Sequence, residues 1–451
     1  MKLELVAMSG VRAASPELTA VGLTLPGFLE RSKVIASLPS LSLLTLAALT
    51  PPDVEVSYRE VPDLAAETEP VRSCDLVAIS SYSAQIDDAY RLAGLYRERG
   101  IPAVMGGLHV TARPDEARAR GVTAVVGEGE LSWERVLADF SLGRLAREYR
   151  PPGGSVYDLA RAPMPRFELL EVERYNRLTV QTSRGCPHLC EFCASSVLLG
   201  PRYKVKPVEK IIAEIRRIKE LWPHPFIEFA DDNSFVRRPH AKELLAALKA
   251  ENVKWFTEAD ISIAGDPELL DLMRASGCRQ VLVGLESPDE DGLDGIEMRS
   301  NWKRNRADDY EGAIRTIQSH GVTVNGCFVL GLDGHDESIF DRVYDFVERS
   351  GLYEVQITVL TPFPGTPLYE RLRAERRLLV EGAWERCTLF DVNFVPSDMS
   401  PEVLQNGLVD LGRRLYEKDF IETRRARFFR DLRASRPGRG NPSPEGKSHD
   451  A

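Results

Sequence analysis

Three cysteines within eight residues are the part of this sequence best suited to chemistry. Cys186, Cys190 and Cys193 are spaced C-x3-C-x2-C and follow Gly185. Thiolates are soft ligands, and closely spaced thiolates on one loop are typical of iron–sulfur clusters. Because no fourth cysteine follows at similar spacing, a four-iron cluster would keep one iron open for chemistry. The alternatives are three structural cysteines, or a zinc site with His188 as its fourth ligand, which would be strained because His188 lies inside the loop.

Acidic and polar side chains follow the apolar segments that come after the cysteine loop. Asp231 and Asp232 follow the apolar run at 226–229, and Glu258 follows the run at 254–257. A carboxylate at the carboxyl end of a barrel strand is more often functional than merely solvated. An exposed turn or helix cap is the alternative for Asp232. Further candidates stand on or just after later segments: Glu286, Ser287, Asn325 and Gly331.

The order of these segments predicts two α/β domains. Residues 1–145 alternate strand-like and helix-like patterns, which predicts a doubly wound, Rossmann-like domain that binds ligands at the carboxyl ends of its strands. From residue 178 onward, longer βα units predict a parallel barrel, or part of one, with the cysteine loop on its catalytic face. The expected strands of the first domain are 54–58, 75–81, 101–105 and 122–126. The expected barrel strands are 178–182, 226–229, 254–257, 280–284, 323–330 and 354–360.

Breaker residues and composition divide the chain further. Stretches rich in Pro and Gly at 151–154 and 162–165 interrupt regular structure. The last residues are rich in Gly, Pro, Ser and charge, which is typical of disorder. We therefore expect a doubly wound domain at 1–145, a linker at 146–175, a partial (β/α)6 barrel at 176–365, a small helical extension at 366–432 and a disordered tail at 433–451.

Composition and charge exclude several classes of protein. The chain has 451 residues, enough for two or three domains, and its net charge of −10 disfavours nucleic acid as a partner. The most apolar early segment, Leu41–Leu49, is too short to span a bilayer, and the first residues lack the apolar run of a signal peptide. Seven cysteines in no paired framework favour a reducing compartment, so we expect a cytoplasmic protein.

The C-x3-C-x2-C spacing resembles the signature of the radical S-adenosylmethionine (SAM) enzymes. The resemblance implies a [4Fe-4S] cluster on Cys186, Cys190 and Cys193, with SAM bound at the open iron and cleaved to a 5′-deoxyadenosyl radical. It also implies a six-stranded partial barrel as the fold. The residues that the resemblance and the strand-end argument assign to SAM or substrate are Phe192, Asp231, Asp232, Glu258, Glu286, Ser287, Asn325 and Gly331.

The first domain resembles the cobalamin-binding domain that often precedes a radical SAM barrel. The resemblance lies in residues 39–51 and in the strand ends at 75–83, 106–109 and 127–130. The Asp-x-His-x-x-Gly motif that supplies a cobalt ligand in other cobalamin proteins is absent, so His109 is not assigned to cobalt. A structural histidine is the alternative for it. The residues expected to contact cobalamin are Ser80, Ser81, Gly106, Gly107, His109 and Gly127.

Together these resemblances predict a cobalamin-dependent radical SAM enzyme, with C-methylation of an unactivated carbon as its reaction. The cofactors would be a [4Fe-4S] cluster, SAM and cobalamin, the substrate a small molecule or lipid, and the electron donor a flavodoxin or ferredoxin. One alternative is a cobalamin-independent radical cyclisation, rearrangement or oxidation. Another is a non-enzymatic cobalamin or redox sensor, against which the strand-end acids argue, since a sensor needs no SAM-binding face.

Overall fold

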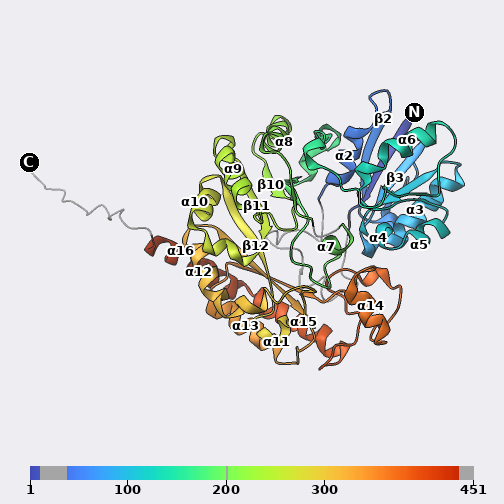
Figure 1. Ribbon diagram of the computed structural model, residues 1–451. Coiled ribbons are helices and arrows are strands. Elements are labelled where there is room, and N and C mark those ends of the chain that lie inside the picture. Colours follow the sequence, from blue (N-terminus) through green and yellow to red (C-terminus); the bar gives the residue numbers. More distant parts are fainter. Residues whose placement is uncertain (11–37, 200–201, 436–451) are drawn as a thin grey trace, which may run out of the picture.

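The computed structural model describes residues 1–10, 38–199 and 202–435, and it contains two six-stranded parallel sheets (Figure 1). The first sheet has the strand order β2-β1-β3-β4-β5-β6. Its strands are β1 (Lys2–Met8), β2 (Glu55–Val61), β3 (Leu76–Ser80), β4 (Ala103–Gly106), β5 (Thr123–Val125) and β6 (Glu148–Tyr149). The chain order reverses at β1, which creates a switch point between β1 and β3 where doubly wound domains bind ligands.

Helices cover both faces of this first sheet, as the predicted doubly wound domain requires. On one face, α3 (Ile86–Glu98), α4 (Leu108–Ala112) and α5 (Pro114–Ala119) pack on residues such as Val77 and Ile79. On the other, α2 (Leu41–Leu49) and α6 (Trp133–Ser141) pack on the alternate residues, such as Leu76 and Ala78. Because side chains alternate along a strand, each face has its own apolar core.

The second sheet follows chain order and forms the predicted partial barrel. Its order is β7-β10-β11-β12-β13-β14, with every neighbouring pair parallel. The strands are β7 (Leu178–Val180), β10 (Phe226–Phe229), β11 (Lys254–Ala259), β12 (Cys278–Glu286), β13 (Thr323–Leu330) and β14 (Glu354–Val359). The helices between them are α8 (Val208–Leu221), α9 (Arg238–Leu248), α10 (Pro267–Ala275), α11 (Glu290–Leu293), α12 (Tyr310–Ser319) and α13 (Ile339–Ser350).

The C-terminal extension is helical at its two ends. It contains α14 (Pro367–Ala374), α15 (Pro401–Leu415) and α16 (Lys418–Ala434). Both α14 and α15 begin with a hydroxyl cap followed by proline: Thr366 accepts from the backbone N–H of Tyr369, and Ser400 from that of Val403. A hydroxyl cap and a proline in the first turn are strong helix start signals. None of the described helices is long and apolar enough to cross a membrane.

The structure differs from the sequence-based predictions in three places. The strand β1, which lies between β2 and β3, is not among the expected strands, and β6 lies in the segment expected to be a linker. Residues 433–434, expected in the tail, still belong to α16, and residues 436–451 of that tail lie outside the described residues. The strand β6 has only two residues, so its sequence carries no alternation that could reveal it.

A buried charged network joins β1, β2 and α3 in the first domain. The Nε of Arg59 donates to Glu4 at 2.7 Å, and the hydroxyl of Tyr96 donates to the other oxygen of the same carboxylate. The side chains of Glu4 and Arg59 are only 1% and 6% exposed. A carboxylate that is buried this deeply depends on its partners.

We expect Arg59→Met to lower the free energy of unfolding by about 3–5 kcal/mol, because it removes the buried cation at 2.7 Å from the Glu4 carboxylate and leaves only the more distant, half-exposed Arg72. Denaturant titration would measure the loss. The matched control is Arg91→Met, which breaks an exposed pair with Asp88 and should cost less than about 1 kcal/mol. Equal losses in the two variants would contradict the burial argument.

Candidate active site

The three cysteines lie on a loop that follows the first barrel strand. The strand β8 (Ser183–Arg184) precedes the loop, and α7 (Ala194–Leu198) begins after its last cysteine. Beyond α7, β9 (Lys204–Val205) pairs with β8 in a short antiparallel hairpin that encloses the loop. Gly185 joins hairpin and loop with a φ of 93°, and a Cβ there would lie 2.5 Å from the carbonyl oxygen of Arg202. Only glycine fits this left-handed, crowded position.

Backbone contacts from two other regions hold the cysteine loop. The N–H of Glu191 donates to the carbonyl of Ile296, and the N–H of Met298 donates to that of Leu189, both at 2.9 Å. On the other side, the guanidinium of Arg371 in α14 forms a bidentate ion pair with Glu191. The loop is therefore fixed both by the connection after β12 and by the C-terminal extension.

Asp231 holds the chain that leads into the loop. Its buried carboxylate accepts from the N–H groups of Thr182 and Ser183 at 2.7 and 2.9 Å, from the Thr182 hydroxyl, and from the Ser234 hydroxyl at 3.0 Å. A carboxylate has about four lone-pair sites, so these bonds use all of them. The expected contact between Asp231 and SAM therefore has no free acceptor in this arrangement.

Asp232 anchors the loop at both of its ends. Its carboxylate accepts from the N–H of Gly185 at 2.9 Å and from the Ser195 hydroxyl at 2.5 Å. The first bond fixes the residue before Cys186, and the second fixes the first turn of α7, just after Cys193. The carboxylate pair after β10 thus shapes the loop.

The donor set of the loop fits an iron–sulfur cluster better than a zinc ion. His188, the alternative fourth ligand, has both ring nitrogens in ion pairs, with Asp260 at 3.3 Å and Glu297 at 3.2 Å. Burial alone would lower the pKa of His188, but the two carboxylates raise it to about 9. Within the described residues, no three His, Cys, Asp or Glu side chains converge on one point, as a single ion would require. Cluster ligands need not converge, because each binds a different iron.

A buried ion pair that the sequence pattern does not reveal lies beside the loop. The Nζ of Lys303 donates to Glu286 and, at 2.9 Å, to the carbonyl oxygen of Gly284. Glu286 has a φ of 65°, which is unusual for a residue with a side chain and typical of functional sites. Burial would lower the pKa of Lys303, but Glu286 and the nearby Cys190 raise it, so the lysine stays charged. Lys303 lies in an irregular connection, where no periodicity marks it.

Glu258 lies among the other acids of the barrel interior. Its side chain reaches solvent, yet protein atoms surround the carboxyl on most sides. Desolvation, then repulsion from Glu228, Asp232 and Glu286, raises the pKa of Glu258 to about 8. The raised pKa favours the protonated form of this carboxyl, which can donate a hydrogen bond.

Buried amide oxygens in the barrel interior lack partners. The Oδ1 of Asn325 on β13 and the Oε1 of Gln356 on β14 have no hydrogen bond within the described part of the chain. Buried acceptors are nearly always satisfied, so both are suited to donors on a bound molecule, such as the hydroxyl groups of a nucleoside. Phe192 packs against the barrel core beside this interior.

Two of the expected contact residues are turned away from the barrel interior. Ser287 is fully buried and shares a hydrogen bond of 3.0 Å with the Nε2 of His335. A Cβ on Gly331 would lie 2.7 Å from Leu404 and 2.9 Å from Phe394, so this glycine allows close packing of the extension. Their placement favours structural roles for both.

The ligand edge of the first domain is formed by the loops after β3, β4 and β5. Gly107 begins α4 with a φ of 107°, and Gly127 has a φ of 78°. Ser80, Ser81 and Gly106 lie beside them, and a Cβ on Gly107 would lie 3.6 Å from the carbonyl of Ser81. Open backbone of this kind suits a large flat ligand, and the residues fit a corrin.

Tyr82 and His109 differ from what the sequence suggests for this edge. The side chain of Tyr82, absent from the expected residues, is 55% exposed at this edge. His109 is buried instead, sharing a hydrogen bond of 3.1 Å with Ser83 and contacting the ring of Trp384 edge-on. This placement supports the structural alternative for His109.

Three regions of the chain match known protein families. Residues 180–347 match the radical SAM superfamily, and residues 38–137 match the B12 binding domain. The chain belongs to the radical SAM superfamily. Residues 366–448 match a domain of unknown function, DUF4070. The N-terminal B12-type domain and the radical SAM barrel confirm the predicted architecture.

Several radical SAM relatives resemble most of this chain. It is 26% identical to bacteriochlorophyllide d C-12(1)-methyltransferase of Chlorobaculum tepidum, over 85% of this chain and 84% of that protein. It is 30% identical to hopanoid C-2 methylase of Rhodopseudomonas palustris, over 77% of this chain and 66% of that protein. The fold matches the radical SAM methyltransferase TsrM of Kitasatospora setae with a TM-score of 0.66 and 17% identity, covering 93% and 89% of the two chains.

We expect Cys186→Ala, Cys190→Ala and Cys193→Ala each to abolish stable iron binding, because a cluster left with two thiolates is labile. Anaerobically reconstituted wild-type protein should bind about four irons per chain, measured by colorimetric iron analysis. Cys74→Ala, in the first domain, is the control and should keep its iron. Full iron content in Cys190→Ala would contradict the assignment.

We expect Glu258→Gln to change how the stability of the cofactor-free protein depends on pH. The folded-state pKa is about 8, whereas the ordinary value for glutamate is about 4.3. Between these two pH values Glu258 is ionised in the unfolded chain but still protonated in the folded chain. The free energy of unfolding therefore falls as the pH rises, and this loss is complete above pH 8. The variant should match the wild type near pH 4 and unfold at a higher temperature near pH 9, measured by calorimetry. Parallel pH profiles would refute the assignment.

Proposed function

We propose that the protein is a cobalamin-dependent radical SAM methyltransferase that adds a methyl group to an unactivated carbon. The observation that carries the proposal is that one chain joins a three-cysteine loop to a B12-type domain whose ligand edge lies against it. The Arg184–Glu128 ion pair, at 2.6 Å, joins the two regions directly. When bound, the cluster supplies the electron that cleaves SAM, and cobalamin carries the methyl group.

The residues of the chain would divide this work by position. The three cysteines would hold the cluster, and Asp232 would fix both ends of their loop. Glu286, paired with Lys303, would orient the polar end of SAM, and Asn325 would bind its ribose. Glu258, whose pKa is raised, would donate a hydrogen bond to SAM or substrate.

The first domain would hold cobalamin without a histidine on cobalt. Gly106, Gly107 and Gly127 would let the backbone approach the corrin, with Ser80 and Ser81 beside it. Tyr82, exposed at the same edge, would contact it through its ring. Because His109 is buried against Trp384, cobalamin should bind with no protein ligand from this side chain.

A small molecule or lipid is the proposed substrate, and a flavodoxin or ferredoxin the proposed electron donor. Relatives named for bacteriochlorophyllide and for hopanoid methylation support the substrate class. We propose the cytoplasm as the location, because none of the seven cysteines, all of them within the described residues, forms a disulfide.

The test of the function is reconstitution with iron, sulfide and hydroxocobalamin, followed by SAM and a reductant. The expected result is retained corrin absorbance after desalting, together with release of 5′-deoxyadenosine. Protein that releases 5′-deoxyadenosine but retains no corrin would overturn the proposed methyltransferase activity and favour a cobalamin-independent reaction. Protein that neither retains corrin nor releases 5′-deoxyadenosine would overturn the proposal that this is an enzyme.

We expect Gly107→Val to lose cobalamin while keeping iron and SAM cleavage. A branched side chain at a φ of 107° would both strain the loop and fill the space beside Ser81. Visible absorbance after desalting measures the retained corrin. The matched control is Gly143→Val, also at a positive φ of 66° but with no neighbouring atom within 4 Å, which should bind cobalamin normally. Equal cobalamin retention in both variants would move the corrin site elsewhere.

A further inference from the structure

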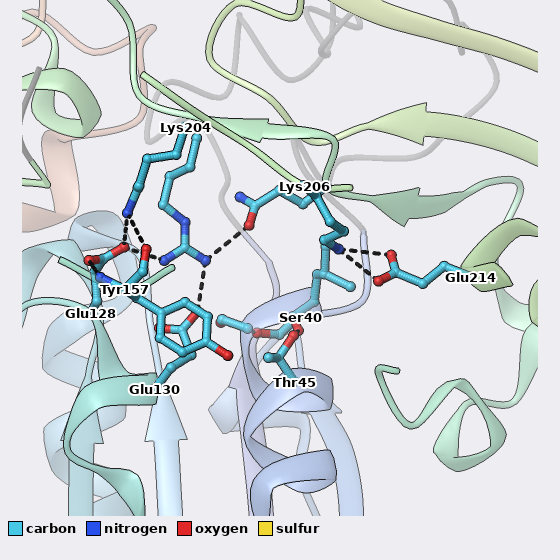
Figure 2. A network of polar contacts seen from close by, with 12 residues as sticks. Ser40, Thr45, Glu128, Glu130, Tyr157, Lys204, Lys206 and Glu214 are labelled. Atoms are coloured by element: carbon cyan, nitrogen blue, oxygen red, sulfur yellow. Dashed lines mark hydrogen bonds and ion pairs between the residues drawn. The ribbon is translucent and has the colours of Figure 1, made fainter. Parts of the chain in front are cut away.

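A cluster of four charged side chains joins the B12-type domain to the β8–β9 hairpin, whose two strands flank the cysteine loop. Figure 2 shows Glu128 and Glu130, from the loop after β5, on one side and Lys204 of β9 on the other. The guanidinium of Arg184 donates to Glu128 at 2.6 Å and to Glu130 at 2.7 Å, and the Nζ of Lys204 donates to Glu128 at 2.5 Å. We call these four residues the interdomain latch.

The latch is shielded from solvent and fully paired. Its four side chains are between 8% and 16% exposed, and its two carboxylates balance its two cations. Burial alone would raise the pKa of Glu128, but bonds from Lys204, the backbone N–H of Tyr157 and Arg184 hold it below its usual range. The carboxylates point at protein partners, so they are not available to a ligand of the first domain.

The two cations of the hairpin would repel each other without the carboxylates of the first domain. Arg184 and Lys204 are direct partners across the antiparallel β8–β9 pair. Like charges placed opposite each other destabilise a strand pair, and this hairpin has only two residues on each strand. The carboxylate of Glu128 bridges the two cations, so docking of the first domain turns a repulsive pair into an attractive one.

Arg184 transmits this dependence to the cluster site. Only Gly185 separates it from Cys186, and the N–H of Gly185 is held by Asp232. The linker also contacts the latch, because the backbone N–H of Tyr157 donates to Glu128 at 2.7 Å and its carbonyl accepts from Lys204 at 3.1 Å. A shift of the loop after β5 would therefore move the first cysteine.

We propose that Glu128 is a positioning residue that sets the geometry of the cysteine loop from the other domain. The latch makes a properly formed cluster site depend on docking of the B12-type domain. The inference rests on the proposed function for the identity of the two cofactors, but the mechanical coupling stands on the contacts alone.

The test is Glu128→Gln in the full-length chain, which keeps the shape and an acceptor but removes the charge. Amide hydrogen exchange at 183–185 and 203–206 should become at least about tenfold faster, because the hairpin cations then repel. Iron loss to a chelator should accelerate, and the electron paramagnetic resonance spectrum of the reduced cluster should broaden. These readouts need no substrate, so they separate failure of the latch from failure of the proposed function.

A second variant distinguishes positioning from simple stability. Adding Lys204→Gln to Glu128→Gln removes the repulsion, so hairpin protection and iron retention should return most of the way to wild type. The matched control is Glu251→Gln, a buried carboxylate that likewise bridges an arginine and a lysine, Arg216 and Lys219, within the barrel. It should leave exchange at 183–185 unchanged. Unchanged exchange and iron retention in Glu128→Gln, or equal losses in the single and double variants, would overturn the proposal.

Discussion

A short loop that presents three thiols to one side cannot satisfy its own backbone, so its shape must come from its surroundings. Here the carboxylates of Asp231 and Asp232 hold the chain that enters the loop and the residues at both of its ends, by accepting their hydrogen bonds. Both aspartates follow β10, the strand next to β7. The parallel pairing of β7 with β10 therefore places the acceptors where the loop needs them, and the site depends on this register.

The barrel was predictable because its sequence signals are long and repetitive. The strand β13 is found at the expected residues, 323–330, and β10 at 226–229. The short elements were not predictable, since β6, β8 and β9 have two residues each and carry no period. The strand β1 was also missed, although its residues from Leu3 to Met8 are all buried.

The sequence marks the cysteines and the strand-end acids as candidate site residues, but it does not reveal their partners. Position at a strand end singles out Glu286 as a candidate, whereas only the folded chain shows that Lys303, seventeen residues later, neutralises it. Likewise the sequence marks Asp231 as functional without revealing that its acceptors face Thr182 and Ser183. Spacing reveals which groups share an edge of a sheet, but long-range pairing decides what each group does there.

The barrel sheet is open, with β7 and β14 as its edges. An uncovered edge strand offers its backbone to any other extended chain and is a common start of aggregation. In this protein the extension covers β14: the N–H of Val359 donates to the carbonyl of Leu389 at 2.7 Å, and α15 lies against the strand. The extension therefore protects the chain from self-association while it supports the site, and a shortened version would have to cover that edge by other means.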